Sequence, residues 1–132
     1  AEREFEALRT LHPAVSVPLP VDINRHTVVM EYIPGATLNR CTLESPKEVL
    51  SEILENVRLA YGNGIIHADL SEFNVMHDGS RVYLIDWPQW VGIDHPNAAE
   101  LLVRDIGNIT RYFTRRYGTD VPADEALGEV TG

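Results

Sequence analysis

Two polar clusters, each enclosed by apolar residues, place the strongest constraint on the fold of this sequence. Asp69 and Asn74 follow the apolar pair 65–66, and Asp86 follows the apolar run 82–85. Polar residues between buried segments lie on loops whose ends are fixed by the core. The fold must therefore present two carboxylates and one amide on short loops with fixed ends.

These side-chain types indicate a particular chemistry. Carboxylate and amide oxygens are the ligands that Mg²⁺ prefers in proteins. In phosphoryl transfer, one carboxylate orients an attacking hydroxyl and accepts its proton, while an amide and a second carboxylate hold magnesium against the nucleotide phosphates. The two clusters therefore predict a phosphoryl-transfer site.

The hydrophobic periodicity predicts an α+β fold in the order helix, strand, helix, hairpin, helix. Helices are expected over residues 1–11, 46–62 and 97–117, and strands over 27–33, 74–76 and 81–85. Ser45 is the expected N-cap, with Pro46 at the first helical position and Glu48 completing a capping box. Asp78-Gly79 predicts the hairpin turn. The residues after the last helix carry no pattern that predicts a structure.

Composition limits the classes of partner and compartment. The 132 residues suit one domain or a large piece of one. A net charge of −9 argues against bulk electrostatic binding to RNA or membranes, and no apolar run approaches membrane-spanning length. The single cysteine, Cys41, excludes an intrachain disulfide and favours a reducing, cytoplasmic location. A late group of arginines predicts a solvated helix face in preference to a nucleic-acid site: Arg104, Arg111, Arg115 and Arg116.

The two polar clusters also resemble a known family. The spacing His67-x-Asp69-x-x-x-x-Asn74, followed by Ile85-Asp86, resembles the catalytic and metal-binding loops of the protein-kinase superfamily. Four segments are similar in sequence to RIO kinases, particularly to archaeal members of the type-2 branch. They are HADLSEFN (67–74), IDWPQ (85–89), HPNA (95–98) and RD (104–105). The resemblance runs from the first residue to about residue 118.

The resemblance implies roles for the polar residues of these loops, with ATP and Mg²⁺ as cofactors. Asp69 matches the catalytic base, and Asn74 and Asp86 match the magnesium ligands. In RIO proteins the aspartate at the position of Asp86 is also implied to accept phosphate transiently. Ser71 stands where ordinary protein kinases carry lysine, so a contact to the substrates and a role in loop geometry both stay open.

The family pattern implies further roles outside the two loops. Met30 to Ile33 resembles the hinge, where the backbones of Glu31 and Ile33 would bind adenine. Glu4 corresponds to the glutamate of the N-lobe helix, and Asp105 to a buried aspartate that braces the catalytic loop. His67, Trp87 and Trp90 are expected to be structural rather than to act on substrates.

A protein-kinase-like fold would divide the chain into an N-lobe remnant with the hinge, residues 1–33, and a C-lobe, residues 34–132. A complete kinase has a Gly-rich loop and a nucleotide-binding lysine before the Glu4 helix. The only lysine here is Lys47, which follows the hinge. The sequence is therefore expected to be truncated at its N-terminus and inactive on its own.

The resemblance implies a Mg-ATP-dependent serine/threonine kinase or ATPase acting on the maturing small ribosomal subunit, with its rRNA and proteins as partners. Ala68 replaces the usual arginine before the base, and Pro88 stiffens the metal loop, which suits an ATPase-like switch. Alternatives are a small-molecule phosphotransferase of the aminoglycoside or choline kinase type, and a non-catalytic docking module on a preribosome.

Overall fold

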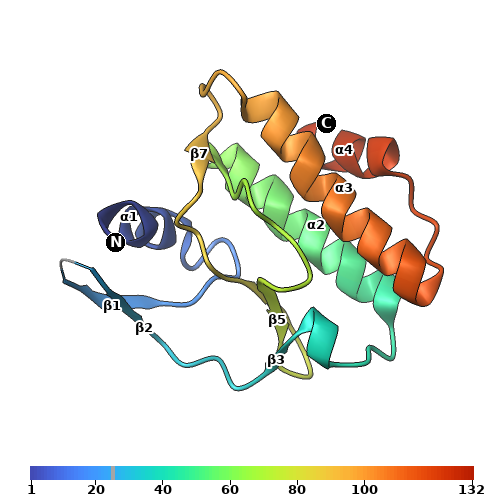
Figure 1. Cartoon of the computed structure of the whole chain (residues 1–132), viewed down its shortest axis with the longest axis horizontal. Coiled ribbons are helices and arrows are strands. Elements are labelled where there is room, and N and C mark those ends of the chain that lie inside the picture. The colour runs from blue at the N-terminus through green and yellow to red at the C-terminus, as the bar shows by residue number, and fades with distance from the viewer. Residues whose placement is uncertain (25) are drawn as a thin grey trace.

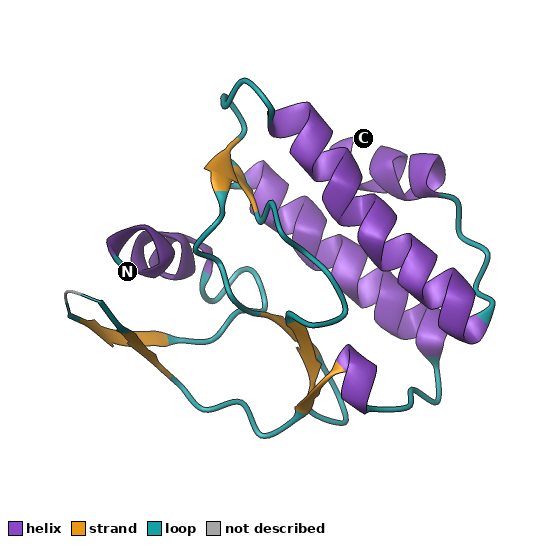
Figure 2. Cartoon of the chain, viewed as in Figure 1, coloured by secondary structure: helices purple, strands orange, loops and turns teal. Residues whose placement is uncertain are grey.

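The computed structural model describes residues 1–24 and 26–132 and confirms the α+β class (Figures 1 and 2). Its helices are α1 (Glu2–Leu11), α2 (Pro46–Gly62), α3 (Ala98–Tyr117), α4 (Ala123–Thr131) and the short 3₁₀ helix η1 (Leu38–Arg40). Its strands are β1 (Pro20–Ile23), β2 (Val28–Met30), β3 (Ala36–Thr37), β4 (Ile65–Ile66), β5 (Val75–His77), β6 (Val82–Leu84) and β7 (Val91–Gly92).

Helices α2, α3 and α4 form the larger part of the core, and each packs against the other two (Figure 1). The apolar stripe predicted for α2 is buried, with Leu50 and Ile53 at its centre. Helix α3 faces it with Ile106, Ile109 and Phe113, which are at most 1% exposed. Residues three and four apart share one helix face, so these stripes bury against each other. No helix among the described residues is long and apolar enough to cross a membrane.

One expectation for the helices is wrong in detail, and one helix was not predicted. Ser45 is the N-cap residue of α2 and Pro46 begins the helix as predicted, but the Ser45 side chain makes no capping hydrogen bond. The Ser45 carbonyl instead accepts the backbone N–H of Val49. Helix α4 was not expected, because its packing rests on only two buried residues, Ala126 and Val130. A stripe this sparse is too weak a pattern to recognise in sequence.

Three small sheets lie beside the helices, in the orders β1-β2, β3-β5-β6 and β4-β7. The predicted hairpin is present as β5 and β6, with Gly79 in its turn at a φ of 103°. The strand expected over 27–33 is shorter, because only β2 pairs with β1 and the chain then leaves the sheet. Gly35 lies where the chain passes β5, and a Cβ atom there would meet the His77 carbonyl oxygen at 2.4 Å. A side chain at position 35 would therefore displace the backbone.

Helix α3 is fastened to the loop between β4 and β5 by one buried carboxylate. Asp105, 1% exposed, accepts the backbone N–H of Ala68 at 2.8 Å and that of Leu70 at 3.0 Å. Burial raises the pKa of the Asp105 carboxyl above its usual value, while the hydrogen bonds from Leu70 and Ala68 act in the opposite direction. The bracing position implied for Asp105 by the sequence is therefore observed.

We predict that Asp105→Ala destabilises the protein strongly. Removing the carboxylate leaves the buried N–H groups of Ala68 and Leu70 without an acceptor, which costs about 2–4 kcal/mol in the free energy of unfolding. Asp105→Asn keeps one acceptor oxygen and should lose about half as much. Urea denaturation measures both. Val103→Ala is the control on the same helix, because Val103 is 50% exposed and its truncation should change stability by less than about 0.5 kcal/mol.

The same residue predicts the sign of a pH effect. Because the pKa of Asp105 is higher in the folded protein, the folded state keeps a proton that the unfolded chain has already released. Its contribution to stability is therefore complete below the unfolded pKa and falls as the pH rises through the folded pKa. The difference in unfolding free energy between wild type and Asp105→Asn should decline over the pH range that begins at about 4, the ordinary pKa of an unfolded aspartate, and ends at the raised folded pKa. A difference that grows over this range would contradict the assignment.

Candidate active site

Asp69 lies at the exposed centre of the loop between β4 and β5, beside a strained backbone residue. Ala68 has a φ of 72°, in the left-handed region that residues with a Cβ atom rarely adopt. The surrounding core holds Ala68 in this conformation, because Ala68 and Leu70 are both buried while Asp69, between them, is exposed. Such strain costs of order 1–3 kcal/mol and persists only where the surroundings enforce it. The Asp69 carboxylate thus projects from a fixed backbone into solvent.

Three side chains of α3 hold the backbone on both sides of Asp69. Asp105 accepts the two N–H groups of Ala68 and Leu70. The Arg104 guanidinium donates to the Ala68 carbonyl at 3.0 Å, and the Asn108 amide donates to the Leu70 carbonyl at 3.2 Å. Every backbone polar group of the two flanking residues therefore has a partner on one helix.

His67 joins this loop to the segment that carries Asp86. Its Nε2 is 2.8 Å from the Ile85 carbonyl oxygen, and its Nδ1 accepts the Asp69 N–H at 3.2 Å. Since Nδ1 accepts, the proton lies on Nε2, which donates to Ile85. The imidazole is buried and packs on the Trp87 ring with centroids 4.6 Å apart. The prediction that His67 is structural is confirmed by these contacts.

Asn74 connects the two loops through its side chain and its backbone. Its Oδ1 accepts the Ser71 N–H at 2.7 Å, and its Nδ2 donates to the Asp69 carbonyl at 2.6 Å. The Asn74 carbonyl accepts the N–H of Ile85, the residue before Asp86, at 3.0 Å. Asn74 is only 6% exposed, so these contacts fix its amide between the two aspartate-bearing segments. The Ser71 hydroxyl accepts the Phe73 N–H at 3.2 Å, which gives Ser71 a role in loop geometry.

Asp86 combines an exposed side chain with a second strained backbone. Its φ is 58°, and it lies next to Trp87, which is completely buried. The Trp87 indole donates to the Leu84 carbonyl at 2.9 Å, and its backbone N–H donates to the Glu4 carboxylate of α1 at 2.9 Å. Trp87 is thus a packing residue, as expected, and Glu4 ties α1 to the chain immediately after Asp86.

The donor set at the two loops fits magnesium better than a metal that needs a full protein cage. Among residues 1–24 and 26–132, no three His, Cys, Asp or Glu side chains gather to hold a metal. Mg²⁺ needs only one or two carboxylates, because waters and substrate phosphates complete its octahedron. Asp86 offers an exposed carboxylate, and Asn74 Oδ1 retains a second lone pair beyond the bond from Ser71.

The predicted hinge follows β2, which contains Met30. The Glu31 N–H donates to the Leu19 carbonyl at 2.9 Å, and the Glu31 carboxylate accepts the Leu19 N–H at 2.9 Å. The Ile33 carbonyl accepts the Gly35 N–H at 2.9 Å. These bonds hold the segment to β1 and fix its exit, while the Glu31 carbonyl and the Ile33 N–H take no part in them.

The sequence did not predict the hydrogen bonds from Arg104 and Asn108 to the loop that carries Asp69. Arg104 was interpreted as part of a solvated face, yet one of its nitrogens donates to a buried loop. The available signal was helical spacing, because Arg104 and Asn108 are four residues apart and flank Asp105. Polar residues at this spacing around a buried carboxylate indicate a common binding partner.

Comparison with known proteins gives consistent results. The sequence model of the RIO domain matches residues 1–126. The chain is 45% identical over 127 residues to the RIO-type serine/threonine-protein kinase Rio2 of Methanocaldococcus jannaschii, covering 91% of this chain and 47% of that protein. It is 36% identical over 137 residues to the RIO-type serine/threonine-protein kinase Rio1 of Haloferax volcanii, covering 98% and 47%. The chain therefore spans about half the length of these relatives.

The solved structures agree with the sequence comparisons. The crystal structure of the Rio2 kinase-ADP/Mg²⁺-phosphoaspartate complex from Chaetomium thermophilum superposes with a TM-score of 0.84 at 27% identity, covering 98% of this chain and 43% of that one. The sequence left RIO kinases and small-molecule phosphotransferases as the two candidate enzyme families, and the relatives at 45% and 36% identity are RIO-type protein kinases. Because the RIO domain model covers residues 1–126, nearly the whole chain, this chain belongs to the RIO family.

Proposed function

We propose that this chain carries two loops of a Mg-ATP-dependent serine/threonine kinase or ATPase of the RIO type. They are the base loop, residues 67–74, which holds the catalytic base, and the metal loop, residues 85–89. Residues 1–33 would be the remnant of the N-lobe with the hinge, and residues 34–132 the C-lobe. The observation that carries the proposal is the arrangement of Asp69, Asn74 and Asp86. Asp69 and Asp86 are exposed residues on two segments that the buried Asn74 joins by hydrogen bonds.

In this proposal Asp69 is the base that orients a hydroxyl or a water molecule and accepts its proton. Asp69 is exposed, and the backbone on both sides of it is fixed by α3. A base on a rigid backbone is held close to its working geometry before the substrates bind, which is the main protein contribution to phosphoryl transfer.

Asn74 and Asp86 would hold Mg²⁺, which neutralises charge on the nucleotide phosphates when bound. One Asp86 oxygen attacks the γ-phosphorus as the bond to the departing ADP oxygen breaks, and ADP leaves with the electron pair. A water then attacks the phosphorus, Asp69 takes its proton, and the Asp86 carboxylate is regenerated with release of phosphate. The Rio2 kinase of Chaetomium thermophilum, crystallised with ADP, Mg²⁺ and a phosphoaspartate, supports this sequence.

The nucleotide base would lie against the hinge. The Glu31 carbonyl and the Ile33 N–H are the groups we assign to adenine, with Met30 of β2 beside them. Ser71, on the loop that carries Asp69, would face the nucleotide phosphates. Glu4, which accepts the Trp87 N–H, would keep the metal loop close to the nucleotide.

The rest of the functional proposal follows from family resemblance. We propose that the protein works in the cytoplasm on the precursor of the small ribosomal subunit, with rRNA and ribosomal proteins as partners. Lys47 is exposed in the first turn of α2, where it cannot hold the α and β phosphates of a nucleotide at the hinge. We therefore expect this chain to be inactive alone and active when an N-terminal RIO segment supplies a phosphate-binding lysine.

We predict that Asp69→Asn lowers phosphate release from ATP by about 10²- to 10⁴-fold, because the amide cannot accept a proton. The assay uses a chimera in which the N-terminal part of the Methanocaldococcus jannaschii relative precedes this chain. Asp124→Asn makes the same change of charge at an exposed position of α4 and should leave the rate unchanged. An Asp69→Asn chimera with the control's rate, folded by circular dichroism, would refute the base assignment.

A second prediction concerns covalent phosphate. Incubation of the chimera with ATP labelled at the γ-phosphate should give protein-bound label that hydroxylamine removes, as expected of an acyl phosphate. Asp86→Asn should abolish this label, whereas Asp69→Asn should increase it, because attack by water is slowed and formation is not. Label that survives Asp86→Asn, or that resists hydroxylamine, would show that the phosphate is carried elsewhere.

A further inference from the structure

An arginine-lined groove lies on α3 beyond the residues assigned to phosphoryl transfer. Arg111 and Arg115 form one wall, and Val121, Pro122 and Ala123, which lead into α4, form the other. The groove has a volume of about 400 Å³. It therefore offers cationic groups beside an apolar surface, outside the base and metal loops.

The groove arginines differ from the neighbouring Arg116, whose guanidinium is occupied by the fold. Arg116 donates to the carbonyls of Leu38 at 2.9 Å and Cys41 at 2.7 Å, which fastens η1 to α3. The Arg115 side chain is 68% exposed, and its contact to Glu72 is 3.8 Å long. Direct ion-pair hydrogen bonds are about 2.7–2.9 Å long, so this contact is loose. Arg115 can therefore accept a better anionic partner.

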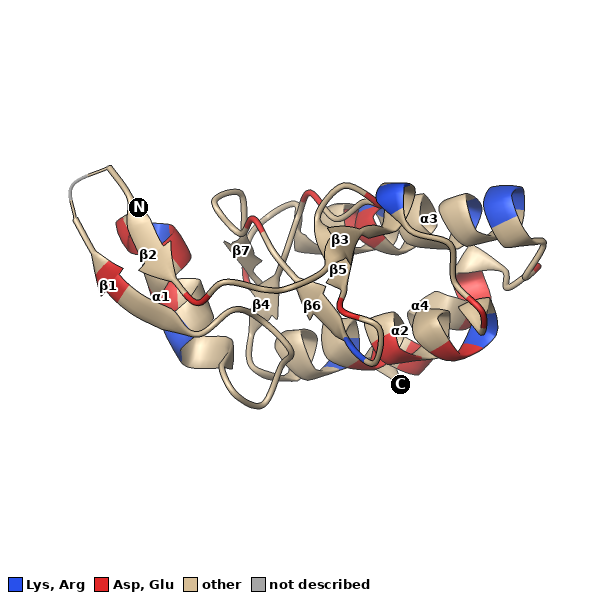
Figure 3. Cartoon of the chain, turned by 90° about the horizontal axis from the view of Figure 1, so that it is seen from below, with Lys and Arg blue, Asp and Glu red and all other residues tan. Residues whose placement is uncertain are grey.

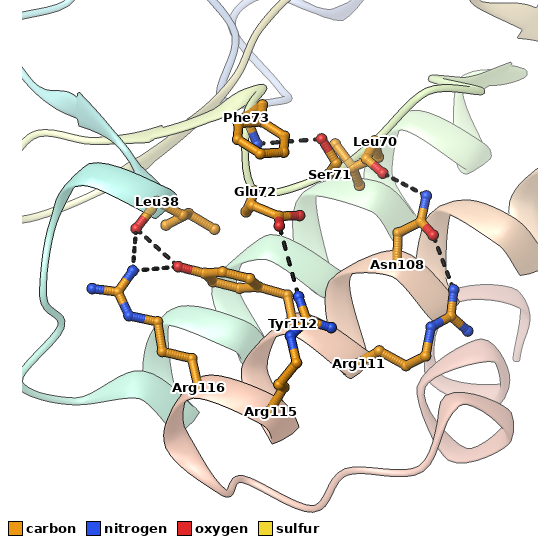
Figure 4. Close-up of polar contacts among 10 residues, drawn as sticks. All are labelled: Leu38, Leu70, Ser71, Glu72, Phe73, Asn108, Arg111, Tyr112, Arg115 and Arg116. Atoms are coloured by element: carbon orange, nitrogen blue, oxygen red, sulfur yellow. Dashed lines mark hydrogen bonds and ion pairs between the residues drawn. The ribbon is translucent and has the colours of Figure 1, made fainter.

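Both groove arginines are linked to the loop that carries Asp69 (Figure 4). Arg111 donates to the Asn108 amide oxygen at 3.0 Å, and Asn108 donates to the Leu70 carbonyl. Arg115 faces Glu72, which follows Asp69 by three residues. Three residues of extended chain span at most about 11 Å, so the backbone of Glu72 lies within about 11 Å of that of Asp69. A ligand on Arg115 would therefore lie near the loop that carries the proposed base.

We propose that this groove binds an acidic segment of a protein substrate, with carboxylates on Arg111 and Arg115 and an apolar side chain against Val121 and Pro122. The proposal rests on the proposed function and adds a recognition site to it. The distance from Glu72 to Asp69 places the acidic residues about three to five positions from the hydroxyl to be phosphorylated.

Charge favours an acidic peptide over a nucleic acid in this groove. The chain has a net charge of −9, which repels any anion, so a short ligand whose charge is confined to the two arginines is favoured over a long phosphate backbone that would cross the acidic surface. Figure 3 shows Lys and Arg positions recurring along α3, while acidic positions are prominent on α2. Two guanidiniums suit one or two carboxylates, each of which they can bind in a bidentate manner. Asp124 and Glu125 follow Ala123 but do not line the groove.

The test is a direct binding measurement with the 132-residue chain, without nucleotide. The probe is a fluorescent peptide in which Asp and Glu alternate with Val, compared by anisotropy with twins carrying Gln or Lys at the acidic positions. The acidic peptide should bind most tightly, and its affinity should fall as ionic strength rises from about 0.05 M to about 0.5 M.

Arg115→Glu should weaken binding of the acidic peptide about tenfold or more and should allow binding of the Lys twin. Arg58→Glu makes the same change of net charge at an exposed position of α2 and should change affinity less than about twofold. Glu72→Gln should strengthen binding, because it removes the carboxylate that competes for Arg115.

Three outcomes would overturn the proposal. These are equal binding of the acidic and Gln peptides, equal losses in Arg115→Glu and Arg58→Glu, and a single-stranded RNA oligonucleotide that binds this face more tightly than the acidic peptide. The last result would assign the groove to nucleic acid. Because no turnover is measured, a failure here is distinct from a failure of the Asp69 and Asp86 assignments, which the chimera tests.

Discussion

The buried carboxylate of Asp105 is the contact on which the geometry of the candidate site depends. A carboxylate in the core is costly unless its oxygens are hydrogen-bonded, and Asp105 satisfies this condition with the N–H groups of Ala68 and Leu70. The raised pKa shows that burial outweighs these bonds. An apolar residue at position 105 would avoid this cost but would leave the loop without acceptors. The cost of burying the carboxylate is thus set against the loss of both acceptors, and Asp105 keeps the residue between Ala68 and Leu70 fixed.

The strained residues at Ala68 and Asp86 show why such fixing is needed. Both have positive φ, and each is next to an almost completely buried residue, His67 before Ala68 and Trp87 after Asp86. These buried neighbours pack in only one arrangement, so the residue beside each of them must take the conformation that remains. Relaxation would turn Asp69 or Asp86 away from its present direction. Local strain and dense packing therefore place both carboxylates before any substrate arrives.

Much of the site was predictable because its pattern is local. Asp69, Asn74 and Asp86 lie within 18 residues, and apolar runs on both sides mark their loops. Helix α3 was predictable from its strong periodicity. The predictions that failed concern features that depend on distant partners, as does the short strand β4, whose Ile66 pairs with Val91 of β7, 25 residues later. A two-residue strand has no period to detect, and its existence is decided by tertiary packing. The unformed capping box of α2 failed similarly, because a motif gives the possibility of a hydrogen bond and not its geometry.

Helix α3 explains how one element can serve the core, the base loop and an outer surface. Arg104, Asn108, Arg111 and Arg115 recur at intervals of four, three and four residues, so they form one stripe along the helix. Ile106, Ile109 and Phe113 lie about a third to a half of a turn away and fill the core. The first half of the polar stripe meets the base loop, and the second half continues past it to the groove. A helix is rigid over this length. A ligand side chain bound to Arg111 or Arg115 would therefore keep a constant distance from the loop that Arg104 and Asn108 hold. The proposed recognition of a protein substrate would require such a constant distance, since the reacting hydroxyl would have to reach Asp69 in a single register.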